Sequence, residues 1–179
     1  MIVAGFDPGW NKINYAMVQH DYNNNRTHLI KWGQLDVHSM GPKDYDNVDL
    51  YLSDIAHKHF DAMNHLLSER PVIHYAFIEK PLFIQNGETT IKISIAAGAI
   101  LFGCRTHGIH SELVTNSAWK KATVDNGNAK KDAIAFEARR LFDLPEYKPD
   151  QWDVYDAALI AYYGALELLK RAKEEDVVR

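Results

Sequence analysis

The sequence is poor in cysteine, in long apolar runs and in excess positive charge. With one cysteine, Cys104, it cannot form an internal disulfide, so we expect a reducing cytoplasm as its location. The apolar residues 2–6 carry no basic segment before them and end at an acidic residue, which does not fit a secretory signal. No apolar run is long enough to span a bilayer, so we expect no membrane partner.

Charge and size narrow the class of protein further. The 179 residues fit one compact domain, 1–179, and 46% of them are hydrophobic and can build its core. The formal net charge of −4 counts mildly against a nucleic-acid partner, unless basic residues gather on one surface or bound cations offset the acids. No glycine-rich phosphate loop of the Walker type is present in the sequence.

Apolar periodicity predicts a chain of strands and helices in a defined order. Three strands come first and later strands alternate with helices, which predicts a mixed sheet with helices on its faces. The fold class is therefore α/β with a central five-stranded sheet. The predicted strands are 2–7, 13–20, 29–37, 72–78 and 109–114. The predicted helices are 49–68, 88–107, 128–142 and 151–173.

Two acidic residues stand at the ends of predicted strands. Asp7 ends the first strand, just before a Pro-Gly turn, and Glu79 ends the fourth, just before a Lys-Pro pair. Open α/β sheets place ligand sites at strand ends, and these two strands can be neighbours in a mixed sheet. Taken alone, Asp7 has a simpler explanation as a turn residue, and Glu79 as an exposed strand end.

Two further acids, Asp153 and Asp156, lie three residues apart near the start of the last predicted helix. This spacing places both side chains on one helical face, about 5–6 Å apart at Cβ. Acids in a first turn also complement the helix dipole, which explains the pair equally well when it is considered alone. Trp152 and Tyr155 beside the acids indicate a partly buried surface, where unpaired carboxylates are costly and need cations.

The four carboxylates together predict a site for a hard divalent cation. Oxygen ligands without cysteine or histidine suit Mg²⁺ or Mn²⁺ and fit zinc poorly. Two such ions about 3.5–4 Å apart can activate a water molecule and stabilise the leaving oxygen when a phosphodiester bond is hydrolysed. The candidate ligands and catalytic residues are Asp7, Glu79, Asp153 and Asp156.

Four blocks of residues carry a resemblance to a known family. They are Phe6-Asp7-Pro8-Gly9 with Tyr15-Ala16, then Ile78-Glu79-Lys80 with Asn86, Lys92 and Ala97-Gly98, then Lys120 with Thr123-Val124, Gly127, Ala129 and Lys131, and finally Asp153-Val154-Tyr155-Asp156-Ala157 with Ala161. Each block alone is weak, because a DPG turn or a DxxDA helix often arises by chance. In this order and at these intervals, from Ile2 to about Tyr163, they resemble the RuvC-type Holliday junction resolvases of the RNase H-like nuclease superfamily.

The resemblance implies an RNase H-like fold and a magnesium-dependent endodeoxyribonuclease with two Mg²⁺ or Mn²⁺ ions per site. The implied substrate is branched DNA, a four-way junction, which a homodimer would resolve by hydrolysing paired phosphodiester bonds. Lys120 and Lys131 match basic residues that hold DNA phosphates. Each has a lysine next to it, Lys121 and Lys130, that could be confused with it in the match. If the gene is phage-encoded, the expected location is the cytoplasm of the bacterial host.

Other residues are assigned by the same resemblance. Leu82 and Phe83 follow the second acid, where the family places an apolar side chain that wedges into the junction; Leu82 matches the position, Phe83 is bulkier, and a core contact explains either one equally well. The helix 88–107, with Ile91, Ile95 and the small residues 96–99, is the candidate dimer interface, though an ordinary core helix has the same pattern. Asn14 stands where the family usually has glycine. The lower overall charge predicts weaker and more salt-sensitive binding to plain duplex.

Three alternative functions stay open. An RNase H-like nuclease acting on structured RNA or on flaps would use the same acids. An actin-like or sugar-kinase ATPase shares the turn after a strand-ending aspartate, but it normally needs a second large domain, for which 179 residues leave no room. A non-cutting junction-binding protein would keep the fold, although all four acids are intact in this sequence.

Overall fold

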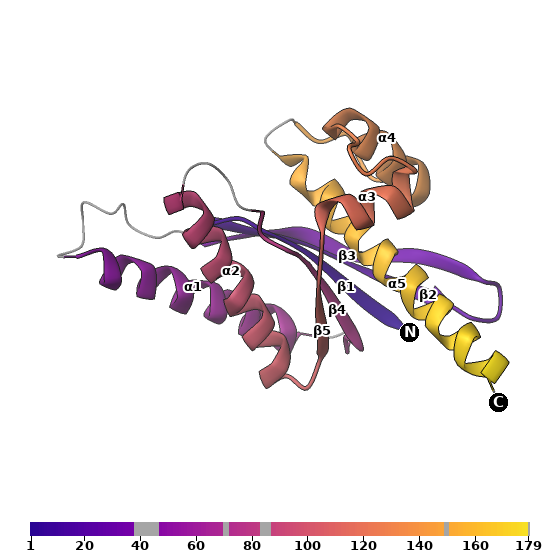
Figure 1. The fold of residues 1–179 in the computed structure, drawn as a ribbon, viewed down its shortest axis with the longest axis horizontal. Coiled ribbons are helices and arrows are strands. Elements are labelled where there is room, and N and C mark those ends of the chain that lie inside the picture. Colours follow the sequence, from indigo (N-terminus) through magenta and orange to yellow (C-terminus); the bar gives the residue numbers. More distant parts are fainter. Residues whose placement is uncertain (38–46, 70–71, 83–86, 149–150, 179) are drawn as a thin grey trace.

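A five-stranded mixed sheet forms the centre of the molecule in the computed structural model (Figure 1). The structure describes residues 1–37, 47–69, 72–82, 87–148 and 151–178. The strands are β1 (Ile2–Pro8), β2 (Lys12–Asp21), β3 (Arg26–Asp36), β4 (Tyr75–Glu79) and β5 (His110–Val114). Their order across the sheet is β3-β2-β1-β4-β5, so the predicted five-stranded sheet is confirmed.

Strand direction decides which chain segments meet at each edge of the sheet. β1, β2 and β3 form an antiparallel meander, because the connections between them are tight turns. β4 returns beside β1 in parallel, with Phe6 paired to Ile78, and β5 adds in parallel to β4. The next residues in this register are Asp7 and Glu79, which therefore end neighbouring strands at the same edge, as predicted.

Helices cover both faces of the sheet (Figure 1). Alternate strand residues point to opposite faces, so β1 sends Phe6 into the layer of α1 and α2 and sends Val3 into the layer of α3, α4 and α5. The helices are α1 (Val48–Ser68), α2 (Gly87–Thr106), α3 (Asn116–Val124), α4 (Lys131–Phe142) and α5 (Asp153–Val178).

Close packing of α5 on β1 depends on a glycine. A Cβ added at Gly5 would lie 2.3 Å from the carbonyl oxygen of Ala157 and 2.3 Å from the amide nitrogen of Ala161. The backbone of α5 therefore rests directly on β1, which the small residues of the helix also allow. The alanines that follow Asp156 in α5 leave room for this close approach to the sheet.

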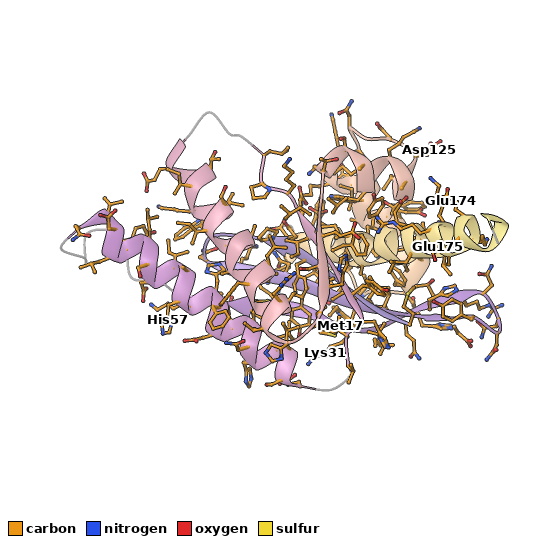
Figure 2. The ribbon with its side chains drawn as sticks, turned by 60° about the horizontal axis from the view of Figure 1, so that its bottom comes forward. Met17, Lys31, His57, Asp125, Glu174 and Glu175 are labelled. Carbon is orange, nitrogen blue, oxygen red and sulfur yellow. The ribbon has the colours of Figure 1, made fainter. Side chains whose placement is uncertain are left out.

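Some element boundaries differ from the sequence-based predictions. The helix α3 was not predicted, because in its nine residues only Trp119 is buried and so little periodicity is left to detect. The strand β4 begins at Tyr75 rather than at residue 72, and α4 begins at Lys131 rather than at residue 128. The helix α5 continues past residue 173, and its last turns include the exposed Glu174 and Glu175 (Figure 2).

One helix among the described residues, α2, is long and apolar enough to cross a membrane if length and composition alone are considered. Polar residues interrupt the apolar run of α2, so the sequence contains no continuous apolar stretch of that length. Soluble proteins contain core helices that pass the same test, and the buried side chains of α2 include Ala97, Ile100 and Cys104 in the core between the helices and the sheet. Of the apolar stretch of α2 that meets this length and composition, 33% is buried inside the molecule.

Candidate metal centre

Three of the predicted acids meet at the edge of the sheet where β1 and β4 end. Asp7 lies on β1, and Asp153 and Asp156 lie in the first turn of α5. One carboxylate oxygen from each of the three lies within 4.8 Å of the others. Residues 146 positions apart in the chain come this close because α5 begins above the end of β1 and then packs on it at Gly5.

Glu79, the fourth predicted acid, lies beside this cluster. It ends β4 and shares a small pocket of about 180 Å³ with Asp7; the other lining residues are Pro8, Lys80, Pro81, Leu82 and Ile93. The Glu79 Oε1 atom accepts a hydrogen bond of 2.6 Å from the side-chain amide of Asn116, at the start of α3. The helix that the sequence analysis missed therefore supplies the residue that orients Glu79.

Burial and mutual repulsion make these carboxylates hard to ionise together. Burial raises the pKa of Asp7 well above its usual value, and the nearby charges of Asp156 and Glu79 raise it further. Burial likewise raises the pKa of Asp156 to about 6, against the effect of Lys131. Burial also raises the pKa of Glu79. A cation bound among these oxygens would relieve the repulsion.

Two lysines supply positive charge to the cluster. The Lys131 Nζ atom lies 2.8 Å from Asp153 Oδ1 and also donates to Asp156 Oδ2, while Lys12 Nζ lies 3.1 Å from Asp153 Oδ2. Burial alone would raise the pKa of Asp153, but these contacts outweigh it and the pKa is lowered. Lys12 was not among the predicted site residues. The Pro-Gly turn after Asp7 could have indicated it, because this turn is closed by a hydrogen bond of 2.9 Å from the Gly9 N–H to the Lys12 carbonyl and so brings Lys12 back beside the acids.

Two buried oxygen atoms at the site fit a cation or its water ligands. Asp156 Oδ1 accepts no hydrogen bond from the described residues, and neither does the side-chain oxygen of Asn14. Asn14 pairs with Asp7 across β1 and β2, so both side chains point to the face that α5 covers. Buried oxygens without partners are costly, and a set made only of oxygens suits a hard divalent cation.

The predicted DNA-contact residues have different surroundings. Lys120 lies on α3, with its Nζ 5.3 Å from the centre of the Trp119 ring, and its charge acts on the Glu79 carboxylate. Lys131 is held by the acids, as described above, and 45% of its side chain is exposed. Leu82 is 56% exposed beside the acid pocket, so it is not a core contact. Phe83 lies outside the described residues.

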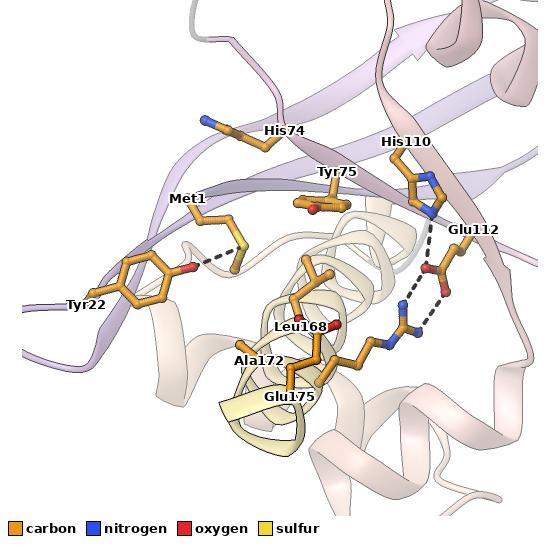
Figure 3. Close-up of a pocket in the computed structure, with 10 residues that line it drawn as sticks. Met1, Tyr22, His74, Tyr75, His110, Glu112, Leu168, Ala172 and Glu175 are labelled. Atoms are coloured by element: carbon orange, nitrogen blue, oxygen red, sulfur yellow. Dashed lines mark hydrogen bonds and ion pairs between the residues drawn. The ribbon is translucent and has the colours of Figure 1, made fainter. Parts of the chain in front are cut away.

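A larger hollow of about 590 Å³ lies at the other end of the sheet (Figure 3). Tyr75 and His110, the first residues of β4 and β5, line it, whereas the acids stand where parallel strands end. Of the two carboxylates that line it, Glu112 and Glu175, the first accepts hydrogen bonds of 2.6 and 2.9 Å from the guanidinium of Arg171. This pairing lowers the pKa of Glu112 and neutralises its charge, so the hollow does not resemble the metal centre.

A mixed sheet in the order β3-β2-β1-β4-β5, with carboxylates at adjacent strand ends and on the packing helix that could hold a metal ion, has the architecture of the RNase H-like fold. The family model described as "Crossover junction endodeoxyribonuclease RuvC" matches residues 3–163. The chain belongs to this family of endodeoxyribonucleases. The family resemblance and the enzyme class predicted from the sequence are confirmed, and the ATPase alternative is wrong.

Named relatives agree with this family in sequence and in fold. The RuvC of Helicobacter pylori strain Shi470 is 30% identical over 169 residues, which cover 94% of this chain and 98% of that protein. The Thermus thermophilus RuvC structure has a TM-score of 0.70 at 22% identity, covering 92% of this chain and 93% of that one. The structure of the yeast mitochondrial Holliday junction resolvase Ydc2 has a TM-score of 0.59 at 13% identity, and the match covers 90% of this chain and 77% of that one. At these identities the two structures support the fold alone.

Proposed function

We propose that this chain is a metal-dependent endonuclease that resolves four-way DNA junctions, with Asp7, Glu79, Asp153 and Asp156 as its metal ligands and catalytic residues. The observation that carries the proposal is the convergence of three carboxylates within 4.8 Å, one of them with a buried oxygen that accepts no hydrogen bond from the described residues. Family membership adds the reaction class, because the matching family consists of crossover junction endodeoxyribonucleases.

The metal site takes Mg²⁺ or Mn²⁺, two ions for each site, through oxygen ligands. When bound, these ions supply an activated water molecule and stabilise the charge of the leaving oxygen in phosphodiester hydrolysis. The protein positions the acids before a metal ion binds. Asn116 orients Glu79, and the close packing of α5 on Gly5 holds Asp153 and Asp156 near Asp7. Lys131 holds two of the acids by ion pairing and then exchanges them for a DNA phosphate.

Substrate contacts surround the acids. Lys120 and Lys131 hold phosphates near the cut, because both project beside the carboxylates from helices α3 and α4. Leu82 is the wedge that enters the branch point, since it is exposed next to the pocket that Asp7 and Glu79 line. Phe83, the bulkier candidate for the wedge, follows it in the sequence.

Symmetric cutting requires two sites, so we propose a homodimer of single-domain chains, 1–179, that acts in the cytoplasm. The outer surface of α2 supports this arrangement. Ile91 is 51% exposed and Phe102 is 60% exposed, and Gly98 between them meets no other residue within 4 Å of its added Cβ. Residues seven and eleven positions apart lie on one helical face, which gives α2 an apolar stripe suited to a second copy.

A cleavage assay tests the proposal. The purified protein is incubated with a four-way junction, plain duplex, a flap and structured RNA, each with Mg²⁺, Mn²⁺ or EDTA, and Asp7→Asn serves as the control. We expect paired nicks in the junction, lost in EDTA and in the variant. Junction binding without cleavage in any metal would support the non-cutting alternative, and preferred cutting of RNA or flaps would support the other nuclease.

A further inference from the structure

An exposed tryptophan stands next to the acid site and has no role in the function proposed so far. Trp10 lies in the turn between β1 and β2, three residues after Asp7, and 39% of its surface is exposed. Large aromatic side chains are usually more deeply buried than this. Trp32 is exposed to the same extent, at 40%, so the position of Trp10 close to Asp7, and not its exposure alone, suggests a role in binding.

The turn that carries Trp10 is held in place from several directions. The Gly9 N–H donates to the Lys12 carbonyl at 2.9 Å, and the Val37 N–H donates to the Asn11 carbonyl at 2.8 Å. The Nε2 atom of the buried His59, on α1, lies 2.9 Å from the Gly9 carbonyl oxygen. An aromatic ring presented from such a braced turn loses little conformational entropy when it binds a flat ligand.

A cation fixes one face of the indole. The Lys92 Nζ atom lies 5.2 Å from the centre of the Trp10 ring and 4.9 Å from that of Tyr51, and it also pairs with Glu88 at 2.6 Å. The neighbouring residue on α2, Ile93, lines the pocket of Asp7 and Glu79. Trp10 is thus attached to the part of α2 that borders the acids.

We propose that Trp10 stacks on a nucleobase at the branch point of the junction and so positions the strand that the acids cut. The proposal rests on the proposed function and deepens it. Bases at a branch point lose part of their stacking within a helix, and an exposed aromatic face can replace it without reading the sequence. Stacking also provides affinity that does not depend on positive charge, which suits a chain with a formal net charge of −4.

Junction binding in EDTA measures the stacking apart from cleavage. We expect Trp10→Ala to weaken binding of a four-way junction about 5- to 150-fold, and Trp10→Phe to keep most of the affinity, because base–aromatic stacking is worth about 1–3 kcal/mol. The matched control is Tyr22→Ala, an aromatic that is 61% exposed at the far end of the sheet. It should bind the junction as the unchanged protein does.

A cycle with abasic nucleotides separates stacking from a structural effect. Each nucleotide around the branch point is made abasic in turn, and both the unchanged protein and Trp10→Ala are measured on every junction. At the stacked position, removing the base should weaken binding by the unchanged protein as much as the Trp10→Ala substitution does on the intact junction. Removing the same base should not weaken binding by Trp10→Ala any further. Equal losses for both proteins at every position would overturn the proposal. If Trp10→Ala does not fold, Trp10→Leu takes its place.

The outcome is independent of whether the protein cuts DNA. Failure of the unchanged protein to cleave junctions with Mg²⁺ or Mn²⁺ would contradict the proposed function, while the binding cycle would still locate the stacked base. Cleavage by the unchanged protein together with unaltered binding by Trp10→Ala would refute the stacking and leave the nuclease in place.

Discussion

Asp153 differs from its neighbours in the acid cluster because it pairs with both Lys131 and Lys12, whereas Asp156 pairs with Lys131. Replacing it with asparagine removes one metal ligand and leaves the two lysines able to meet DNA phosphates. We expect Asp153→Asn to lower the rate of junction cleavage by at least about 100-fold, as loss of a ligand weakens metal binding, while the variant still binds the junction. Cleavage rates and gel-shift binding in EDTA measure the two effects.

A matched control for Asp153→Asn is Asp132→Asn, which removes one negative charge at an exposed position on α4. This control should cut at the rate of the unchanged protein. An Asp153→Asn variant that cuts normally, or that no longer binds junctions, would show that the ligand assignment is wrong.

The raised pKa of Asp7 has a consequence for stability. In the folded protein the carboxyl group holds its proton more tightly than in the unfolded chain, where its pKa is near 3.8. The free energy of unfolding therefore falls as the pH rises from 3.8 through the raised pKa of the folded state. We expect Asp7→Asn to raise the free energy of unfolding of the metal-free protein at pH 7.5 by about 1–2 kcal/mol, or roughly 2–8 °C in Tm. Thermal unfolding in EDTA measures it.

The pH dependence distinguishes this cause from a general stabilisation. At pH 4 the Asp7→Asn variant should melt close to the unchanged protein, because Asp7 is then largely protonated in the folded state. Adding Mg²⁺ should raise the Tm of the unchanged protein more than that of the variant. A variant that melts below the unchanged protein at pH 7.5 in EDTA would contradict the repulsion inferred for this cluster.

At the scale of elements, the contact between α5 and β1 places the acids. A methyl group at Gly5 would collide with the backbone at Ala157 and Ala161, so α5 would have to shift away from the sheet. We expect Gly5→Ala to lower the free energy of unfolding by about 1–3 kcal/mol. Because a displacement of about 1 Å at a site can cost about 100-fold in rate, cleavage should fall even where the protein is fully folded.

The control for Gly5→Ala is Gly87→Ala, because an added Cβ at Gly87 meets nothing within 4 Å. Both variants are compared by thermal unfolding and by junction cleavage at a temperature where each is folded. Unchanged melting and cleavage in Gly5→Ala would mean that α5 does not depend on this close approach.

Elements also differ in how well the sequence predicted them. The strands and the long helices α1, α2 and α5 were predicted because their apolar periodicity extends over many residues. The helix α3 was missed, and with it the role of Asn116 as the partner of Glu79. The starts of β4 and α4 were placed three residues too early because caps and turns, rather than periodicity, decide where an element begins.

At the scale of the whole molecule, the apolar stripe of α2 is the surface that we propose for dimerisation. We expect Ile91→Glu to convert a dimer to a monomer, because a charge placed in an apolar interface loses its hydration without gaining a partner. Light scattering coupled to size-exclusion chromatography measures the mass. A monomer should also cut the two strands of a junction independently, which is visible as loss of paired nicking.

The control for this variant is Phe136→Glu, which places the same charge at a residue that is 70% exposed on α4. Its mass should equal that of the unchanged protein. If both the unchanged protein and Ile91→Glu are monomers, or both are dimers, α2 is not the dimer interface.

The sequence by itself determined the candidate acids, the α/β class and the five strands, because residue type and periodicity are local properties of a chain. Only the tertiary structure decided how close α5 comes to β1 and which lysines reach the acids. It also placed Asn14, Asn116 and Trp10 around the site. These features depend on packing between segments far apart in the chain, and on the space that Gly5 leaves, which local patterns do not encode.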